Sequence, residues 1–235
     1  MKVLIAIPAY NEADILEKNI IKLHDFLKKI KHNWRIIISN NASQDKTLEI
    51  AKKLAKKYKK VSFVSWKDRP KSLSIKRTWL KKEFDSYDIY SYMDADLSTD
   101  IKHFPQLIEG VKQGYDIAIG SRIIKARSFL RAILSKGLLL ILKIFFQIKI
   151  KDFQCGFKAI NRKTRNEIIP KMKAVNHGFM DTEMLVVANH KGYKIKEIPV
   201  SWSDERKSKV RFVSDIIDTF KNILRIKKDL ILGRY

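Results

Sequence analysis

Short apolar runs alternate with longer stretches of helical periodicity in the first half of the chain, and this alternation restricts the fold more than any other feature. The runs that predict strands are Val3–Ile7, Arg35–Ser39, Val61–Ser65, Ile89–Met93 and Asp116–Ile119. The segments that predict helices, with apolar residues every three or four positions, are Glu12–Ile30, Ser43–Tyr58 and Ser72–Phe84. This order favours an α/β fold with a mainly parallel sheet and helices on both faces.

Polar turns follow three of these predicted strands, at Pro8–Glu12, Asn40–Ser43 and Asp94–Asp96. Ligands of such sheets bind outside the carboxyl ends of the strands, so we expect these turns to face one crevice. The chain lacks the G-x-G-x-x-G and G-K-[ST] patterns, which excludes the usual dinucleotide-binding and P-loop classes. Because it contains only 8 glycines, phosphates would be held by a metal and basic side chains rather than by a glycine-rich loop.

Asp94 and Asp96 are the strongest candidates for a functional site, because they directly follow the predicted strand Ile89–Met93. Residues i and i+2 of a strand point the same way, so the two carboxylates would converge where the strand ends. Neighbouring carboxylates repel each other unless a cation neutralises them, and Mg²⁺ is typically held by one or two carboxylates plus substrate phosphates. The alternative is a solvated acidic turn or a pair of helix caps. With 25 acidic against 49 basic residues, a chance acidic pair is less expected and the metal site is favoured.

The net charge of +24, with an isoelectric point near 10.0, calls for an anionic partner or surface. Nucleic acid, anionic lipid headgroups and phosphorylated substrates all meet this requirement. No helix-turn-helix, zinc or RNA-recognition signature occurs, so no specific nucleic-acid partner is predicted. The single cysteine, Cys155, excludes an internal disulfide.

Basic amphipathic segments occupy the second half, at Phe129–Ile150 and in the tail from Arg206 to Tyr235. Such helices either dock on their own domain or lie on an anionic membrane surface. We expect a main domain over residues 1–211 and a basic amphipathic helix over residues 212–235. No run reaches the roughly 20 apolar residues of a membrane span, and no signal peptide is expected. The prediction is a cytoplasmic protein bound peripherally to an anionic membrane surface.

Seven motifs occur in one order along the chain. They are I-P-A-Y-N-E (Ile7–Glu12), N-N-A-S-Q-D-K-T (Asn40–Thr47), M-D-A-D-L-S (Met93–Ser98), G-S-R (Gly120–Arg122), D-F-Q-C-G-F-K-A-I (Asp152–Ile160), G-Y-K-I-K-E-I-P-V-S-W (Gly192–Trp202) and R-K-S-K-V (Arg206–Val210). Together they resemble family 2 glycosyltransferases, and within that family the dolichol-phosphate mannose synthase and dolichol-phosphate glucosyltransferase group.

This resemblance implies a GT-A fold, a nucleoside-diphosphate sugar as donor, and Mg²⁺ or Mn²⁺ as cofactor at Asp94, Asp96 and Ser98. The residues it assigns to the nucleotide sugar are Pro8, Tyr10, Glu12, Asn41, Lys71, Asp94, Ala95, Asp96, Arg122, Arg206 and Lys209. Arg131 and Ser135 match the family's R-x-x-x-S, which is associated with the acceptor phosphate.

The chain departs from the family pattern at three places. Ser98 stands where the family often has glutamine, and Asn40-Asn41 replaces two acids. Arg69-Pro70-Lys71-Ser72 replaces the glycine-rich G-K-G segment.

The predicted catalytic residues are Asp96, Arg122, Asp181 and Glu183. A metal that bridges the diphosphate neutralises the departing group, and Arg122 can add charge-assisted bonds. A hydroxyl acceptor would need a general base, for which Asp181 and Glu183 are candidates. A lipid phosphate is already an anion and needs none, and Glu183 would then position the sugar or hold a basic neighbour. Both acids could instead cap the helix Thr182–Asn189.

The predicted function is metal-dependent, inverting transfer of mannose or glucose to dolichyl or polyprenyl phosphate. It would take place at the cytoplasmic face of a membrane, with a small membrane-anchoring partner as an option. The alternative is transfer to a saccharide or protein hydroxyl, with Asp181 as general base. Nucleic-acid binding is the remote third possibility.

Overall fold

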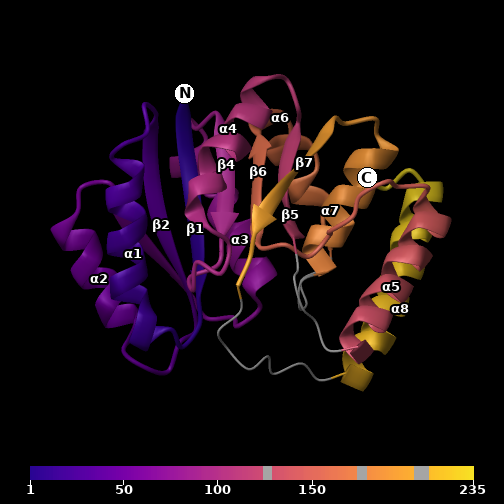
Figure 1. Ribbon diagram of the computed structural model, residues 1–235, viewed down its shortest axis with the longest axis horizontal. Coiled ribbons are helices and arrows are strands. Elements are labelled where there is room, and N and C mark those ends of the chain that lie inside the picture. Colours follow the sequence, from indigo (N-terminus) through magenta and orange to yellow (C-terminus); the bar gives the residue numbers. More distant parts are fainter. Residues whose placement is uncertain (124–128, 174–178, 204–211) are drawn as a thin grey trace.

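The sheet of the computed structural model has seven strands in the order β3-β2-β1-β4-β6-β5-β7 (Figure 1). The structure describes residues 1–123, 129–173, 179–203 and 212–235, without the side chains of residues 129–136, 138 and 212–217. The strands are β1 (Lys2–Ala9), β2 (Asn33–Asn41), β3 (Val61–Trp66), β4 (Ile89–Met93), β5 (Ile117–Ile123), β6 (Phe157–Asn161) and β7 (Ile195–Ser201). Neighbouring strands are parallel except where β6 runs antiparallel between β4 and β5. The mainly parallel sheet predicted from the sequence is therefore confirmed.

Helices cover both faces of the sheet, as predicted. One face packs against α1 (Ala13–Leu27), α2 (Thr47–Lys57) and α4 (Phe104–Lys112), and the other against α3 (Lys71–Trp79), α5 (Phe129–Phe146), α7 (Phe179–His190) and α8 (Phe212–Ile231). A short helix, α6 (Arg162–Glu167), follows β6. Alternate residues of β1 enter different cores, Leu4 and Ala6 on one side and Val3, Ile5 and Ile7 on the other, because successive side chains of a strand point to opposite faces.

The predicted elements of the first half lie close to the observed ones. The strand Ile89–Met93 has the predicted bounds. The other four observed strands extend one to four residues beyond a predicted end, and β5 begins one residue later than predicted. The predicted helix Ser72–Phe84 is wrong at its end, because α3 stops at Trp79 and a separate 3₁₀ turn covers Lys82–Phe84. Lys81 between them has an extended backbone (φ −65°, ψ 128°), which breaks the helix.

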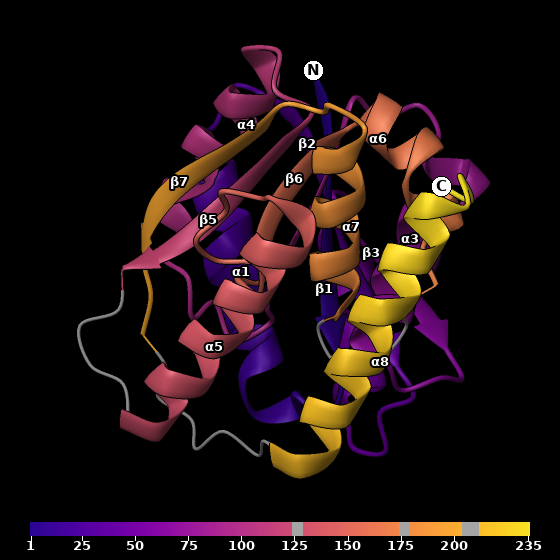
Figure 2. The ribbon, with the colours of Figure 1, turned by 90° about the vertical axis from the view of Figure 1, so that its right-hand side faces the viewer.

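Helix α8 lies beside α5 at one end of the molecule and packs against α7 (Figures 1 and 2). Its inner face buries Ile223 and Ile226, whereas Phe220 and Leu224 on its outer face are exposed. The Lys227 ammonium donates a hydrogen bond to the carbonyl of Phe145 at the end of α5 (3.0 Å). The tail helix thus docks on its own domain while keeping an apolar outer face. No helix in the described part of the chain is long and apolar enough to cross a bilayer.

Candidate active site

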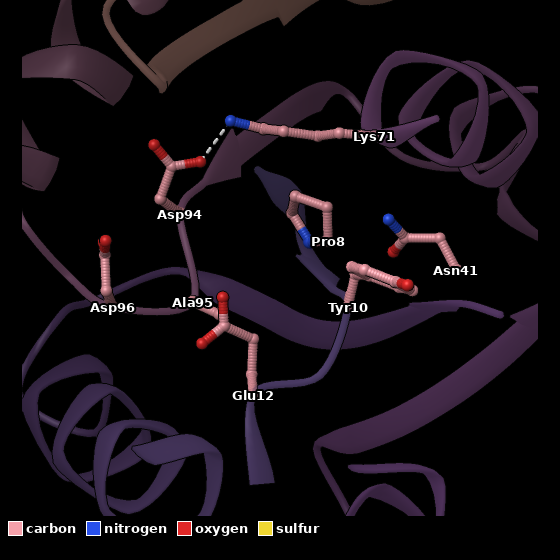
Figure 3. Close-up of a pocket in the computed structure, with 8 residues that line it drawn as sticks. All are labelled: Pro8, Tyr10, Glu12, Asn41, Lys71, Asp94, Ala95 and Asp96. Carbon is pink, nitrogen blue, oxygen red and sulfur yellow. Dashed lines mark hydrogen bonds and ion pairs between the residues drawn. The ribbon is translucent and has the colours of Figure 1, made fainter. Parts of the chain in front are cut away.

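One pocket opens at the carboxyl ends of β1, β2 and β4 (Figure 3). It has a volume of about 200 Å³. Its lining residues are Pro8, Tyr10, Glu12, Asn41, Lys71, Asp94, Ala95 and Asp96. All eight belong to the set that the sequence assigns to the nucleotide sugar. The structure thus brings together turns that are separated by up to 88 positions in the chain, from Pro8 to Asp96.

The three turns of the pocket are held in unusual backbone conformations. Asn11, Ala42 and Leu97 follow β1, β2 and β4, and each has a positive φ (53°, 56° and 52°). Such a conformation is costly for residues other than glycine and persists where surrounding bonds enforce it. Asp45 supplies one of these bonds, because its carboxylate accepts the backbone N–H of Ala13 (3.1 Å) and so ties the first turn to the second.

Asn41 carries an acceptor that finds no hydrogen-bond partner among the described residues. Its side-chain amide donates from Nδ2 to the carbonyl of Arg69 (3.0 Å), but the buried Oδ1 is unsatisfied. A buried acceptor without a partner is costly and points to a donor group that arrives with a ligand. The position of Asn41 in the pocket wall gives that ligand a place.

Asp94 is fixed on two sides. The ammonium of Lys71 forms an ion pair with Oδ1 of Asp94 (Figure 3). On the other side, a Cβ atom at Gly156 would overlap the Asp94 carboxylate. Gly156 is therefore the residue that lets the antiparallel strand β6 approach the first aspartate so closely.

Asp96 is held by the backbone of its own turn, since its Oδ1 accepts the N–H of Ser98 (2.9 Å). The described residues contain no group of three or more His, Cys, Asp or Glu that could hold a metal. Asp94 and Asp96 offer only carboxylate oxygens, which are the ligands that Mg²⁺ and Mn²⁺ prefer. A divalent cation therefore fits this pair if the remaining ligands come from a substrate diphosphate and water. The role of Ser98 as a third ligand stays a prediction.

Arg122 lies at the end of β5 in a bidentate ion pair with Asp152, at 2.6 Å and 2.9 Å. Its guanidinium also stacks on the ring of Trp202, 5.3 Å from the centroid. Burial works against the charged form of Asp152, but the bonds from Arg122 outweigh it and lower the pKa of the carboxyl below its ordinary value. Arg122 is thus an oriented cation outside the residues that line the pocket, and its contact with a diphosphate stays a prediction.

Asp181 lies in the first turn of α7 and is not among the residues that line the pocket, and only 6% of the residue is exposed. Its carboxylate accepts a hydrogen bond from the hydroxyl of Tyr92 (2.5 Å) and lies 3.3 Å from the ammonium of Lys158, which is fully buried. Burial and the neighbouring Asp181 raise the pKa of Tyr92 well above its ordinary value, so this phenol remains the donor. Both contacts are made to the same oxygen, Oδ1 of Asp181.

Glu183 is not brought to the pocket. Its fully buried carboxylate accepts hydrogen bonds from Arg225 (2.9 Å) and from the hydroxyl of Tyr235, both in the C-terminal region. It also accepts the backbone N–H of Lys173 (3.1 Å). Of the roles considered for Glu183, the contact with a basic neighbour is present in the structure.

Four predicted site residues cannot be located. Arg206 and Lys209 lie outside the described residues, and the side chains of Arg131 and Ser135 on α5 are not described. Their predicted contacts with donor and acceptor phosphates stay predictions.

The family model that matches this chain is Glycosyl transferase family 2, over residues 4–169. The chain belongs to this family. It is a glycosyltransferase, as its motifs predicted.

Three curated relatives show how broad the similarity is. The chain is 32% identical to Glycosyltransferase AglD of Haloferax volcanii over 233 residues. This matched region covers 96% of this chain but only 37% of that protein. It is 29% identical to the dolichyl-phosphate beta-glucosyltransferase of Saccharomyces cerevisiae, over 98% of this chain and 75% of the relative. It is 30% identical to the dolichol-phosphate mannosyltransferase of Pyrococcus furiosus, over 97% of this chain and 64% of the relative. The chain thus spans from about a third to three quarters of the length of these relatives.

The fold of this glycosyltransferase has close counterparts among solved structures. One is glucosyl-3-phosphoglycerate synthase from Mycobacterium tuberculosis, crystallised with Mn²⁺, UDP and glucosyl-3-phosphoglycerate. The two structures superpose with a TM-score of 0.69 over 99% of this chain and 79% of that chain, at 15% identity. At such low identity the likeness concerns the fold alone, and it confirms the predicted GT-A fold.

Sequence reasoning missed four residues that shape the site. Tyr92 and Lys158 hold Asp181, Gly156 accommodates Asp94, and Asp152 orients Arg122. Three of them lie in the motif Asp152–Ile160, which gave the resemblance but no roles. Their partners lie 23 to 62 residues away in the sequence, and the antiparallel placement of β6 brings them together. The only available signal was a glycine and a lysine in a motif shared with the family.

Proposed function

We propose that this glycosyltransferase transfers a hexose, glucose or mannose, from a nucleoside-diphosphate sugar to dolichyl or polyprenyl phosphate, and that it depends on a divalent metal. The observation that carries the proposal is the pocket in which two aspartates, a lysine and an unsatisfied asparagine acceptor line one cavity. The dolichyl-phosphate glucosyltransferase and the dolichol-phosphate mannosyltransferase among the relatives support the acceptor class and leave glucose and mannose as alternatives.

The donor would lie across the three turns. Oδ1 of Asn41 would accept an imino N–H of the base, since it is buried and has no partner among the described residues. Both uracil and guanine carry such a group. Asp94 and Asp96 would hold Mg²⁺ or Mn²⁺, which when bound would neutralise charge on the leaving diphosphate. Lys71 and Arg122, and with them Arg206 and Lys209, would add charge-assisted bonds to the phosphates.

The acceptor is inferred from the state of Asp181. A hydroxyl acceptor needs a base close to the attacking oxygen, whereas the Asp181 carboxylate is buried, and its Oδ1 already accepts the hydroxyl of Tyr92 and pairs with the ammonium of Lys158. A phosphate monoester of a lipid alcohol is already an anion at neutral pH and attacks without a base. We propose Asp181 as a positioning residue, and Arg131 and Ser135 as the residues that bind the acceptor phosphate.

Access to a lipid acceptor would come from the outer surfaces of α5 and α8. Among their described side chains, these helices expose six large apolar ones, namely Leu140, Ile144, Phe145, Phe220, Leu224 and Ile231. Lys143, Lys221 and Lys228 are exposed on the same helices. Apolar side chains bordered by lysines suit the interface of an anionic bilayer. We propose that the protein binds peripherally to the cytoplasmic face of a membrane, with a small anchoring protein as a further possible partner.

The test measures transfer from UDP-glucose and GDP-mannose to dolichyl phosphate and to free saccharides, with Mn²⁺ or with EDTA. We expect metal-dependent product only with dolichyl phosphate. Asp181→Asn should keep at least about a tenth of the rate, since loss of a general base would instead cost about 10²-fold or more. Because this change leaves Lys158 buried beside a neutral group, the rate is compared at a temperature where circular dichroism shows the variant folded. Transfer to a saccharide that Asp181→Asn abolishes would support the hydroxyl-acceptor alternative.

A further inference from the structure

Lys71 occupies a position that is unfavourable for a cation by local criteria. It is the first residue of α3, and no acidic side chain lies in the first turn of that helix. The N-terminus of a helix carries partial positive charge and favours anions, so a lysine there loses rather than gains stability. Residues that break a local rule in this way often serve a ligand.

The ammonium of Lys71 is turned towards the aspartates. It pairs with Asp94 and lies 5.4 Å from the centroid of the Tyr92 ring. Among the described residues, no lysine or arginine forms an ion pair with Asp96, whose Oδ1 accepts only a backbone N–H. Within the described part of the chain, the two carboxylates therefore have one ion-pair partner, Lys71, which leaves one negative charge without such a partner.

We propose that the Lys71 ammonium holds the place of the metal at Asp94 until the donor arrives, and then passes to the donor's diphosphate. This inference rests on the proposed function. A divalent cation and an ammonium at the same carboxylate repel each other, so each weakens the contact of the other with Asp94. Lysine has a flexible four-carbon stem and three donors, which suits an exchange of partners.

The pocket gives the displaced ammonium a second partner. Lys71 lines the same cavity as Tyr10 and Asn41, where the nucleotide would lie. When a diphosphate enters, it supplies oxygens for both the metal and the ammonium. Metal and donor then each make binding of the other more favourable, and this coupling is reciprocal. The metal would bind weakly to the free protein and tightly to the protein with donor.

The first test is binding of Mn²⁺ alone, followed by the electron paramagnetic resonance signal of free Mn²⁺ without nucleotide. If Lys71 competes with the metal, Lys71→Met binds Mn²⁺ about three- to tenfold more tightly than the wild type, the size expected for one partly exposed charged pair. Lys71→Arg keeps the charge and should stay within about twofold of the wild type. An unchanged or weaker Mn²⁺ affinity in Lys71→Met overturns the inference.

Arg69→Gln is the matched control, because it removes one positive charge two residues away. The Arg69 guanidinium lies over the ring of Tyr10, 5.6 Å from the centroid, rather than on an aspartate. If Arg69→Gln tightens Mn²⁺ binding as much as Lys71→Met, the effect comes from net charge and the inference fails.

The second test is the affinity for UDP, or for GDP if the wild type binds it more tightly, at saturating Mn²⁺. Lys71→Met should bind this diphosphate about tenfold more weakly, since a charge-assisted contact is lost. We expect Lys71→Met to raise the affinity for Mn²⁺ alone and to lower the affinity for the diphosphate. If both affinities change in the same direction, the inference is overturned. Neither measurement requires turnover. If both affinities change as expected but no sugar is transferred, the proposed function alone is contradicted.

Discussion

The carboxylates at the end of β4 and those between α7 and α8 have opposite surroundings. The side chain of Asp94 is 33% exposed and has one ion-pair partner among the described residues, Lys71. Asp229 on α8 is 3% exposed and lies within 4 Å of three cations, those of Lys173, Arg225 and Arg234. Charge that is only partly neutralised and open to solvent can still take up a cation. Charge that is buried and fully paired holds two elements together.

Asp181 and Glu183 belong with the second kind, although the sequence groups them with the catalytic residues. Glu183 joins α7 to α8 through Arg225 and Tyr235, and Asp181 joins α7 to the sheet through Lys158. Helix α7 thus carries one carboxylate towards the pocket side and one towards the tail helix. Exposure and pairing distinguish the two kinds of carboxylate, whereas residue type does not.

The largest effect is expected at the partly exposed carboxylates at the end of β4, Asp94 and Asp96. Asp94→Ala should abolish Mn²⁺-dependent nucleotide binding and lower turnover by about 10³-fold or more, because the metal would lose one of its two carboxylate ligands. The melting temperature should hardly change, since a partly exposed charge is removed. A variant that transfers sugar at nearly the wild-type rate would contradict the assignment of the metal site. Asp68→Ala, which removes a partly exposed carboxylate paired with Arg77, serves as control.

A change at the buried carboxylates between α7 and α8 should lower stability rather than nucleotide binding. Glu183→Ala removes the partner of Arg225 and Tyr235 and should lower the free energy of unfolding by about 3–5 kcal/mol, as for other broken buried ion pairs. Urea denaturation of wild type and variant measures this difference. In the folded variant, affinity for UDP or GDP with Mn²⁺ should be unchanged. A stable variant that no longer binds nucleotide would place Glu183 in the active site after all.

The open site was accessible to sequence reasoning because its parts are local. Each turn directly follows a strand, so Tyr10, Asn41 and Asp94 could be assigned to one edge once a parallel sheet was inferred. The buried set could not be predicted, because its pairs join residues such as Glu183 and Arg225, 42 positions apart in the chain. No local pattern specifies which lysine or arginine will meet a given acid.

The antiparallel strand β6 shows the same limit within the fold. It lies in a segment where the sequence predicted no strand, and it separates β4 from β5. Its position decides that Gly156 lies against Asp94 and that Lys158 meets Asp181. The parallel part of the sheet was predictable from the alternation of elements, whereas this insertion depends on pairing between distant segments.

A smaller effect is expected at Gly156, which lies against the Asp94 carboxylate. Gly156→Ala places a methyl group on the Asp94 carboxylate, which must move from its present position beside Lys71. We expect Mn²⁺-dependent nucleotide affinity to fall about tenfold to a hundredfold, as for loss of a charged contact of about 1.5–3 kcal/mol. Isothermal titration calorimetry measures the change. The matched control is Gly137→Ala on α5, where a Cβ would meet no atom within 4 Å. Equal behaviour of the two variants would mean that Asp94 tolerates the displacement.

The smallest effect concerns the outer face of α8 and its neighbour α5, whose inner faces are already packed. Replacing the exposed Leu140, Phe145 and Leu224 with serine should weaken binding to anionic vesicles about tenfold, since three apolar side chains no longer enter the interface. Co-sedimentation with vesicles of anionic and of neutral lipids measures it, and salt should release part of the wild-type protein because lysines contribute screened attraction.

The control for this last comparison is Phe63→Ser, a similarly exposed apolar residue on β3, which is the edge strand opposite β7. It should leave vesicle binding unchanged. The triple variant should also keep its nucleotide affinity and its melting temperature, because the changed side chains are exposed and the Glu183 and Asp229 contacts remain. If the triple variant unfolds instead, these side chains stabilise the packing of α5 on α8. The outer face would then serve the fold, as the buried ion pairs of Glu183 and Asp229 do, rather than a membrane contact.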